Sequence, residues 1–328
     1  MALTHSSLSA VLAVTPFIFT FLPLLLPTID RLLEGLKQRD PRAIGRAITL
    51  VENGDESAQA ILSALDEDLI SQATILGITG PPGAGKSTLT NCIISELRQR
   101  KKRIGIIAVD PSSPISGGAI LGDRIRMMQH ATDQDVVMRS MATRGRLGGL
   151  CATAGAAVRI MASCGCSTII IETVGVGQSE MDIIRLADIT LLVLAPGLGD
   201  DIQAMKAGLL EVADLMVVNK ADCKGADILA MDLETVTRKG SDTSAQVSMT
   251  VATEGKGITE LLGRIATIDS EHRDSGERER RRRGAHDQEV LDWCLEIMRP
   301  ELLAKITKKR LNLLGDPRLK AKEILKEK

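Results

Sequence analysis

The sequence is poor in aromatic residues, with three Phe, one Trp and no Tyr among 328 residues. Proteins that bind single-stranded nucleic acid stack the bases on aromatic side chains, so we expect no partner of that kind. Lysine and arginine number 41 against 42 aspartates and glutamates, which leaves a net charge of −1. A chain with balanced charge has no overall field that attracts nucleic acid or an anionic membrane.

Cysteines are few and scattered along the chain. They are Cys92, Cys151, Cys164, Cys166, Cys223 and Cys294. This spacing is more typical of reduced thiols in a cytoplasmic protein than of a disulfide framework, and we predict a cytoplasmic location. Cys164 and Cys166 form a close pair, yet without a clustered His or a further Cys they make an incomplete metal site. We interpret them as buried core thiols.

The N-terminal stretch differs in composition from the rest of the chain. The apolar run 11–27 is short for a membrane span and is broken by Pro16, Pro23 and Pro27. Residues 1–10 contain no Lys or Arg. A secretory signal or a mitochondrial presequence would require such basic residues. We predict a disordered or loosely packed extension and no membrane association, with an export or membrane role as the alternative.

Four segments are predicted from the composition. Residues 1–27 form the extension, 28–72 a helical segment, 73–268 a sheet domain, and 269–328 a charged linker with a C-terminal helical arm. The linker contains Arg280–Arg283, which we interpret as a solvated helix face rather than a phosphate contact. Because helices outside a compact sheet domain often serve oligomerisation, we predict a homodimer.

Short apolar runs alternate with helical patterns in the sheet domain. We predict strands over 74–79, 104–109, 168–172, 189–195, 214–219 and 244–251. Runs such as "STIIIE" and "ITLLVLA" are typical of strands buried on both faces, as in a parallel sheet. The predicted fold is a doubly wound α/β domain, mainly parallel, with ligands at the carboxyl ends of its strands.

The stretch "TGPPGAGKST" (79–88) follows the first predicted strand and matches the phosphate-binding loop of P-loop proteins. Its backbone N–H groups can face phosphates, Lys86 can reach the β- and γ-phosphate oxygens, and Ser87 can bind Mg²⁺. A helix over about 87–100 adds the positive end of its dipole. The candidate binding residues here are Gly80, Pro81, Pro82, Gly83, Ala84, Gly85, Lys86, Ser87 and Thr88.

The motif "NKAD" (219–222) ends a later strand and indicates guanine as the base. Asp222 can accept hydrogen bonds from N1–H and the N2 amine of guanine, whereas adenine would leave this carboxylate unpaired. Lys220 can lie along the base, and Asn219 can tie neighbouring loops together. The sequence therefore favours GTP over ATP.

Candidate metal and switch residues lie between these two motifs. Asp110, Asp123 and Glu172 follow or end predicted strands and can supply oxygen to Mg²⁺, directly or through water. Gly175 can offer its N–H to the γ-phosphate, and hydrolysis would remove that contact and release the loop.

A longer set of motifs resembles a known family. From about Thr28 to Leu262 the chain resembles the MeaB/ArgK/MMAA family of P-loop GTPases. The motifs are GPPGAGKST, VDPSSPISGGAILGDRIRM, RSMATRGRLGGL, ETVGVGQSE, PGLGDDIQAMKAG and NKAD. The resemblance implies slow GTP hydrolysis and a chaperone role toward an adenosylcobalamin-dependent acyl-CoA mutase. Such a chaperone gates cofactor loading and protects the mutase.

The resemblance also implies roles for particular residues. Segment 196–208 resembles a partner-facing switch, with a solvent-exposed helix cap as the alternative interpretation. Its polar residues are Asp200, Asp201, Gln203 and Lys206. Where relatives have Ser-Ala near guanine O6 this chain has Val251-Ala252, and a backbone N–H can still make that contact. Arg139, Arg144 and Arg146 could offer positive charge to the γ-phosphate or the partner.

Catalysis is predicted to involve Lys86, Asp123, Glu172 and Gln178. In Ras-like switches a glutamine that follows the switch glycine orients the attacking water. Here Val176 follows Gly175 and Gln178 comes two residues later, so we expect slow intrinsic hydrolysis.

Three other functions compete with the switch. A small-molecule kinase needs a general base beside an acceptor pocket, and no His or isolated carboxylate stands out as one. A non-enzymatic module would bind the nucleotide without turning it over. Only Cys164 and Cys166 would support a role as a metallochaperone.

Overall fold

The computed structural model describes residues 29–110, 130, 132–142, 149–173, 179–198, 207–240, 246–309 and 316–326. The predicted extension at 1–27 lies outside this part of the chain. Within it, no helix is long and apolar enough to cross a membrane.

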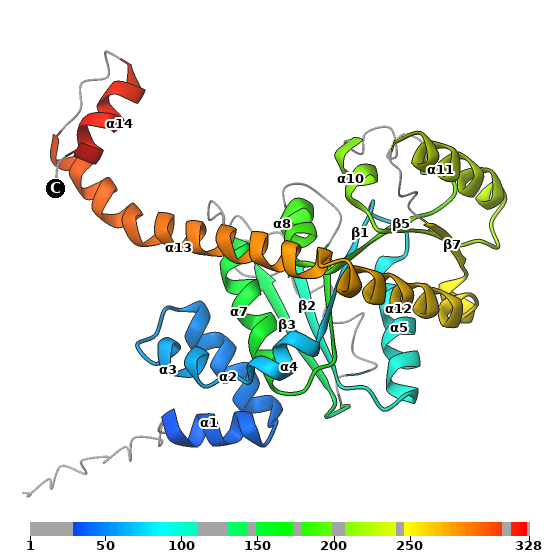
Figure 1. Cartoon of the computed structure of the whole chain (residues 1–328), viewed down its shortest axis with the longest axis horizontal. Coiled ribbons are helices and arrows are strands. Elements are labelled where there is room, and N and C mark those ends of the chain that lie inside the picture. Colours follow the sequence, from blue (N-terminus) through cyan, green and yellow to red (C-terminus); the bar gives the residue numbers. More distant parts are fainter. Residues whose placement is uncertain are drawn as a thin grey trace, which may run out of the picture.

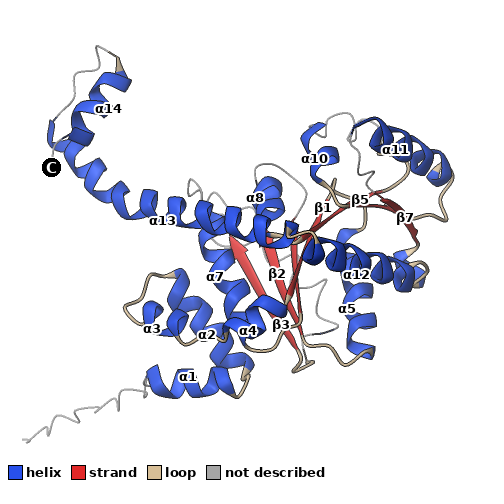
Figure 2. Cartoon of the chain, viewed as in Figure 1, coloured by secondary structure: helices blue, strands red, loops and turns tan. Residues whose placement is uncertain are grey.

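Seven parallel strands form one sheet in the order β3-β2-β4-β1-β5-β6-β7. Figure 2 shows the strands in red. The strands are β1 (Thr74–Thr79), β2 (Ile104–Asp110), β3 (Val136–Ala142), β4 (Thr168–Thr173), β5 (Ile189–Leu194), β6 (Leu215–Asn219) and β7 (Gln246–Thr250). The predicted doubly wound α/β fold is confirmed, because helices cover both faces of this sheet. Strand order reverses at β1, where ligands of such folds bind.

Helices cover the two faces of the sheet in different sets. On one face α5 (Lys86–Gln99) and α12 (Ile258–Asp274) share a buried cluster with β1 and β5. On the other lie α7 (Gly149–Ser163), α8 (Ser179–Leu186), α10 (Ala207–Val212) and α11 (Ala226–Gly240). Successive residues of β5, such as Leu191 and Leu192, face opposite sides of the sheet, as a strand period of two requires.

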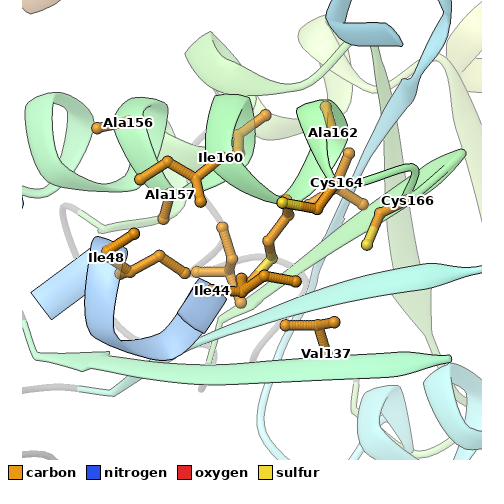
Figure 3. Close-up of a cluster of buried hydrophobic side chains, with 14 of the residues drawn as sticks. Ile44, Ile48, Val137, Ala156, Ala157, Ile160, Ala162, Cys164 and Cys166 are labelled. Atoms are coloured by element: carbon orange, nitrogen blue, oxygen red, sulfur yellow. The ribbon is translucent and has the colours of Figure 1, made fainter. Parts of the chain in front are cut away.

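Four N-terminal helices join the core on the α7 side of the sheet. They are α1 (Ile29–Lys37), α2 (Pro41–Glu52), α3 (Ala58–Ser63) and α4 (Glu67–Gln72). Helices α2 and α4 pack against α7, and α1 and α3 pack against α2. Helix α2 begins where the side chain of Asp40 accepts a hydrogen bond from the N–H of Arg42. Ile44 and Ile48 of α2 lie against Ile160 of α7 and above Val137 of β3 (Figure 3). These helices therefore share a core with the sheet.

Strand β3 was not predicted from the sequence. Val136, Val137 and Met141 are buried. Arg139 and Ser140 lie between Val137 and Met141 and interrupt the apolar pattern. Pairing with one neighbour, β2, at the edge of the sheet tolerates such residues. Arg139, a candidate for contact with phosphate or partner, forms an ion pair with Glu52 of α2.

Helix α13 (Glu277–Lys309) crosses the body and then extends away from it, carrying α14 (Pro317–Lys326) (Figure 1). Its distal part exposes several large apolar side chains. Those more than two-fifths exposed are Val290, Leu291, Leu295, Ile297, Met298, Leu303 and Ile306. Near the body, Glu289 forms a bidentate ion pair with Arg159 of α7 at 2.6 and 2.7 Å. This pair connects α13 to α7.

The arginine-rich start of α13 is only in part the solvated face that the sequence predicted. The side chain of Arg278 is 2% exposed and pairs with Asp269 at 2.9 Å. Arg282 donates to both carboxylate oxygens of Asp188, at 2.8 and 2.7 Å. Arg280 points outward, at 77% exposure. The prediction for Arg280–Arg283 is therefore confirmed for Arg280 and Arg283, which are exposed. It was wrong for Arg281 and Arg282, because their acidic partners lie far away in sequence.

Arg281 makes a similar contact with a second carboxylate. It donates to both oxygens of Asp214 at 2.8 and 2.7 Å. Asp214 in turn accepts the N–H of Thr190, and Asp188 accepts the N–H of Ile75. The arginines thus join α13 to the starting ends of β5 and β1, opposite the ends where ligands bind. We call Arg278, Arg281, Arg282, Asp188, Asp214 and Asp269 the arginine clamp.

Candidate nucleotide-binding site

The loop after β1 has the backbone conformation that its glycines were expected to permit. Gly80, Gly83 and Gly85 have φ angles of 141°, 80° and 90°, a region that other residues rarely adopt. A Cβ at Gly80 would overlap the carbonyl oxygen of Val193, and one at Gly85 would overlap Nδ2 of Asn219. Space as well as conformation therefore requires glycine at two of the three positions.

Lys86 lies inside this loop at the start of α5. Its side chain is buried, and Nζ donates to the carbonyl oxygens of Gly80 at 2.7 Å and Pro81 at 3.0 Å. The ammonium group is thus held beside the first turn of a 14-residue helix, whose N–H groups and dipole favour an anion. The arrangement can bind a phosphate chain.

Ser87 and Glu172 bring two distant motifs into contact. Ser87 Oγ donates to Glu172 Oε1 at 2.6 Å. The contact follows from the sheet, because β1 and β4 are neighbours and Ile78 is in register with Glu172. A hydroxyl and a buried carboxylate are the hard oxygen donors that Mg²⁺ prefers, so this pair fits the predicted metal. Asp110 ends β2 beside β4, but its side chain is outside the described set.

A cavity of about 830 Å³ opens beside these groups. It is lined by Pro82, Gly83, Gly85, Lys86, Ser87, Thr88, Asn91, Cys92, Glu172, Thr173, Lys220, Ala252 and Thr253. One cavity therefore runs from the phosphate loop and the acidic strand end to the loops after β6 and β7. Its size suits a nucleotide.

Asn219 links three loops beneath the far end of the cavity. Its Nδ2 donates to the carbonyl of Ala84 at 2.9 Å. Its Oδ1 accepts from Thr250 Oγ1 and from the N–H of Ala252, both at 3.2 Å. Because Asn219 is 2% exposed, it acts as a buried brace rather than as a surface contact for the base.

The remaining base-motif residues lie at the open rim. Lys220 has a φ of 57° and lines the cavity. Asp222 is exposed and is not one of the lining residues. It lies close enough to Lys256 to contribute, after Glu254, to raising the pKa of that lysine. The carboxylate therefore stands beside the cavity and not inside it.

The loop after β7 differs from the expectation in one respect. The N–H of Val251 donates to the carbonyl of Lys256 at 3.1 Å, and that of Ala252 to Asn219 Oδ1. Both N–H groups are therefore engaged within the protein, and the cavity extends one residue further, to Thr253. Sequence reasoning missed Thr253, Asn91 and Cys92, although the latter two lie four residues after Ser87 and Thr88 on the same helix.

Several predicted residues fall outside the described part of the chain. They are Asp123, Gly175, Gln178, Asp200, Asp201, Gln203 and Lys206, together with Arg144 and Arg146. Their roles stay predictions. Two described helices, α8 and α10, begin directly after the segments that contain Gly175 and Lys206.

Cys164 and Cys166 are buried, as predicted, at 1% exposure each (Figure 3). Burial raises the pKa of Cys164 to about 12 and that of Cys166 to about 11. A metal would need thiolates, and the described residues hold no cluster of three or more His, Cys, Asp or Glu that could bind one. These thiols therefore give no support to a metallochaperone.

Comparison with known proteins agrees with this geometry. The family described as "Methylmalonyl Co-A mutase-associated GTPase MeaB" matches residues 44–310. The chain belongs to the MeaB family. The resemblance in the motifs is thereby confirmed, and this MeaB-family GTPase carries the family's phosphate loop on its predicted fold.

Individual relatives extend the match over most of the chain. A Pyrococcus horikoshii protein named "Putative GTPase" is 49% identical over 285 residues, covering 85% of this chain and 90% of that protein. "Methylmalonic aciduria type A homolog, mitochondrial" of Mus musculus is 34% identical over 290 residues, covering 81% and 69%. A solved structure, "LAO/AO transport system kinase", is 25% identical with a TM-score of 0.64, covering 91% of this chain and 96% of that one.

Proposed function

We propose that this MeaB-family protein binds and hydrolyses GTP as a chaperone of an adenosylcobalamin-dependent acyl-CoA mutase. In this role it gates cofactor loading and protects the mutase. The observation that carries the proposal is the single cavity that joins Lys86, the Ser87–Glu172 pair and Lys220. The family description, which names association with methylmalonyl-CoA mutase, supports the choice of partner.

Residues in and beside the cavity bind different parts of the nucleotide. Lys86 and the N–H groups at the start of α5 bind the β- and γ-phosphates, and Ser87 and Glu172 hold Mg²⁺, with Asp110 and Asp123 in its surroundings. Mg²⁺ neutralises charge on the phosphate oxygens. At the other end, Lys220 covers the base and Asp222 recognises its N1–H and N2 edge.

The switch is proposed to work through the loops that follow β4 and β5. Gly175 contacts the γ-phosphate, and hydrolysis removes that contact. Segment 196–208, with Asp200, Asp201, Gln203 and Lys206, transmits the change to the mutase. Because no glutamine follows Gly175 directly, intrinsic hydrolysis is slow and the partner accelerates it, with Gln178 available to place the water.

The test is co-purification with methylmalonyl-, isobutyryl- and ethylmalonyl-CoA mutases, each with GDP or a non-hydrolysable GTP analogue. GTPase rates are then measured with and without the bound mutase. We expect nucleotide-dependent binding to one mutase, faster hydrolysis with it, and loss of turnover in Lys86→Ala but not in Lys102→Ala, a surface control. A GTPase rate that does not change when a mutase is bound would contradict the proposal. Transfer of phosphate to a small acceptor as fast as GDP forms would also contradict it.

We also propose a homodimer that covers the apolar side chains of distal α13. Exposure of 51% at both Leu291 and Leu295, four residues apart on one helix face, supports this. Glutamate at these two positions should give monomers in analytical ultracentrifugation. Ile228→Glu on α11, at a position 67% exposed, is the control and should leave the mass unchanged. A wild-type monomer would contradict the proposal.

A further inference from the structure

The N–H and the carbonyl group of Ala252 each form a hydrogen bond with a side chain from another part of the chain. The N–H of Ala252 donates to Asn219 Oδ1 at 3.2 Å. Its carbonyl oxygen lies 2.9 Å from Sγ of Cys92, which donates to it. Asn219 belongs to the base motif, whereas Cys92 belongs to α5, the helix that begins at the phosphate loop. Ala252 thus connects the two ends of the nucleotide site.

Cys92 is placed to act as a hydrogen-bond donor. It is half-buried, packs against the cluster between α5 and the sheet, and lines the cavity together with Lys220 and Thr253. Burial raises the pKa of its thiol, so the proton stays on sulfur at neutral pH. The thiol can therefore donate to the Ala252 carbonyl throughout the physiological range.

The turn at Ala252–Glu254 has other bonds, but they serve a different purpose. Glu254 N–H donates to the Val251 carbonyl, and Val251 pairs with Lys256 in both directions. These short-range bonds fix the internal shape of the turn. The Cys92 bond instead fixes how far the turn stands from α5, and so from the phosphates that α5 binds.

We propose that Cys92 is a positioning residue for base recognition. It holds the Ala252–Glu254 turn at the distance from α5 where the backbone of the turn meets O6 of a guanine. The inference rests on the proposed binding of GTP. Asp222 would read the N1–H and N2 side of the base, whereas Cys92 acts on the O6 side alone.

This division of labour makes the inference testable with base analogues. A 2-aminopurine nucleotide keeps the N2 amine but lacks O6 and, with it, the proton on N1. Every variant should therefore bind it more weakly than GDP, but this binding does not depend on where the turn stands, because there is no O6 for the turn to meet. Cys92→Ala removes the thiol donor from α5 and leaves the Ala252 carbonyl with the Gly255 N–H, a donor next to the same turn. Cys92→Ser restores a side-chain donor of similar size on α5. Cys223→Ala, at an exposed thiol after the base motif, is the matched control.

The experiment measures the affinities of GDP, ADP and 2-aminopurine riboside diphosphate for wild type and the three variants, with melting temperatures alongside. In Cys92→Ala we expect GDP affinity to fall about three- to tenfold, the effect of one hydrogen bond, with the 2-aminopurine affinity unchanged. Cys92→Ser should bind GDP as wild type does, and so should Cys223→Ala.

Three results would overturn the inference, two of them in Cys92→Ala and one in Cys92→Ser. One is unchanged GDP affinity in Cys92→Ala, and the other is an equal loss for GDP and the 2-aminopurine nucleotide, which would mean a general structural effect. A serine variant as weak as the alanine variant would also count against it. Failure of the proposed function looks different, because wild type itself would then bind ADP as well as GDP.

Discussion

Ser87 and Glu172 are joined by a 2.6 Å hydrogen bond between residues 85 positions apart in sequence. The bond brings the end of the phosphate loop and the end of β4 to one point at the carboxyl edge of the sheet. Both groups are oxygen donors beside the Lys86 ammonium. A metal that bridges phosphate and protein would therefore find two of its ligands already assembled.

Ser87→Ala should weaken the effect of Mg²⁺ on GTP binding. The variant removes one oxygen ligand and leaves Lys86 in place, so we expect about a tenfold loss of GTP affinity in Mg²⁺, equivalent to about 1.4 kcal/mol. With EDTA the loss should largely disappear. Ser95→Ala on the same helix, whose hydroxyl faces His130, is the control. An equal loss with and without Mg²⁺ would rule out the metal role.

Gly85→Ala and Gly83→Ala separate backbone strain from crowding. Both glycines have left-handed φ angles, but only at Gly85 would the added Cβ overlap Asn219, since no atom of the described residues lies within 4 Å of a Cβ at Gly83. We expect each variant to lose about 1–2 kcal/mol of unfolding free energy from strain. Gly85→Ala should lose more and should also abolish measurable GTP binding. Equal effects in urea unfolding and GTP titration would contradict the crowding argument.

The arginine clamp should contribute to stability through Asp188. This carboxylate is 1% exposed and faces Arg278 and Arg282. Asp188→Asn removes the carboxylate that pairs with Arg282 and one of the two that face Arg278, which keeps Asp269. Breaking a buried pair in this way typically costs 3–5 kcal/mol. Glu254→Gln breaks an exposed pair with Lys256 and should cost far less, because solvent screens such pairs. Similar urea midpoints for the two variants would show that the clamp is dispensable.

Much of the fold follows from local sequence. Buried strands such as 168–173 read as continuous β-branched runs, and the phosphate loop has a fixed spacing after β1. Strand β3 could not be found in this way, because Arg139 interrupts it and its partners, β2 and Glu52, come from elsewhere in the chain. Edge strands of this kind depend on tertiary contacts more than on pattern.

The site was predictable at its motifs and less so between them. Spacing identified Lys86, Ser87 and Asn219, because the chemistry requires those residue types at those positions. The Cys92–Ala252 contact spans 160 positions, and neither residue type is characteristic of a nucleotide site. The arginine clamp was misread for a similar reason, since a run of arginines looks solvated until Asp188 and Asp214 are placed beside it.

The buried thiols predict a loss of stability at alkaline pH. The pKa values of Cys164 and Cys166 are raised in the folded protein, to about 12 and about 11, from an ordinary 9.0. The contribution of the two protonated thiols to the free energy of unfolding is therefore complete below pH 9. It is lost as the pH rises toward their pKa values in the folded protein. At pH 10.5 we expect each to cost about 1–2 kcal/mol.

Urea unfolding between pH 7.5 and 10.5 measures this loss. Replacing both Cys164 and Cys166 by alanine should flatten the dependence, although the variant starts from a lower stability. Replacing the exposed Cys223 and Cys294 should leave the slope as it is in wild type. A slope that survives loss of the buried pair would assign it to other groups.

Lys86 is proposed to hold the phosphate chain while Asp222 selects guanine. Competition titration with GTP, ATP and XTP tests this most directly. Wild type should bind GTP about a hundredfold more tightly than ATP. Asp222→Asn should prefer XTP, because xanthine carries an acceptor oxygen where guanine has its N2 amine, and the asparagine amide can donate to it. Equal affinity of wild type for GTP and ATP, or an Asp222→Asn variant that still prefers GTP, would contradict the account.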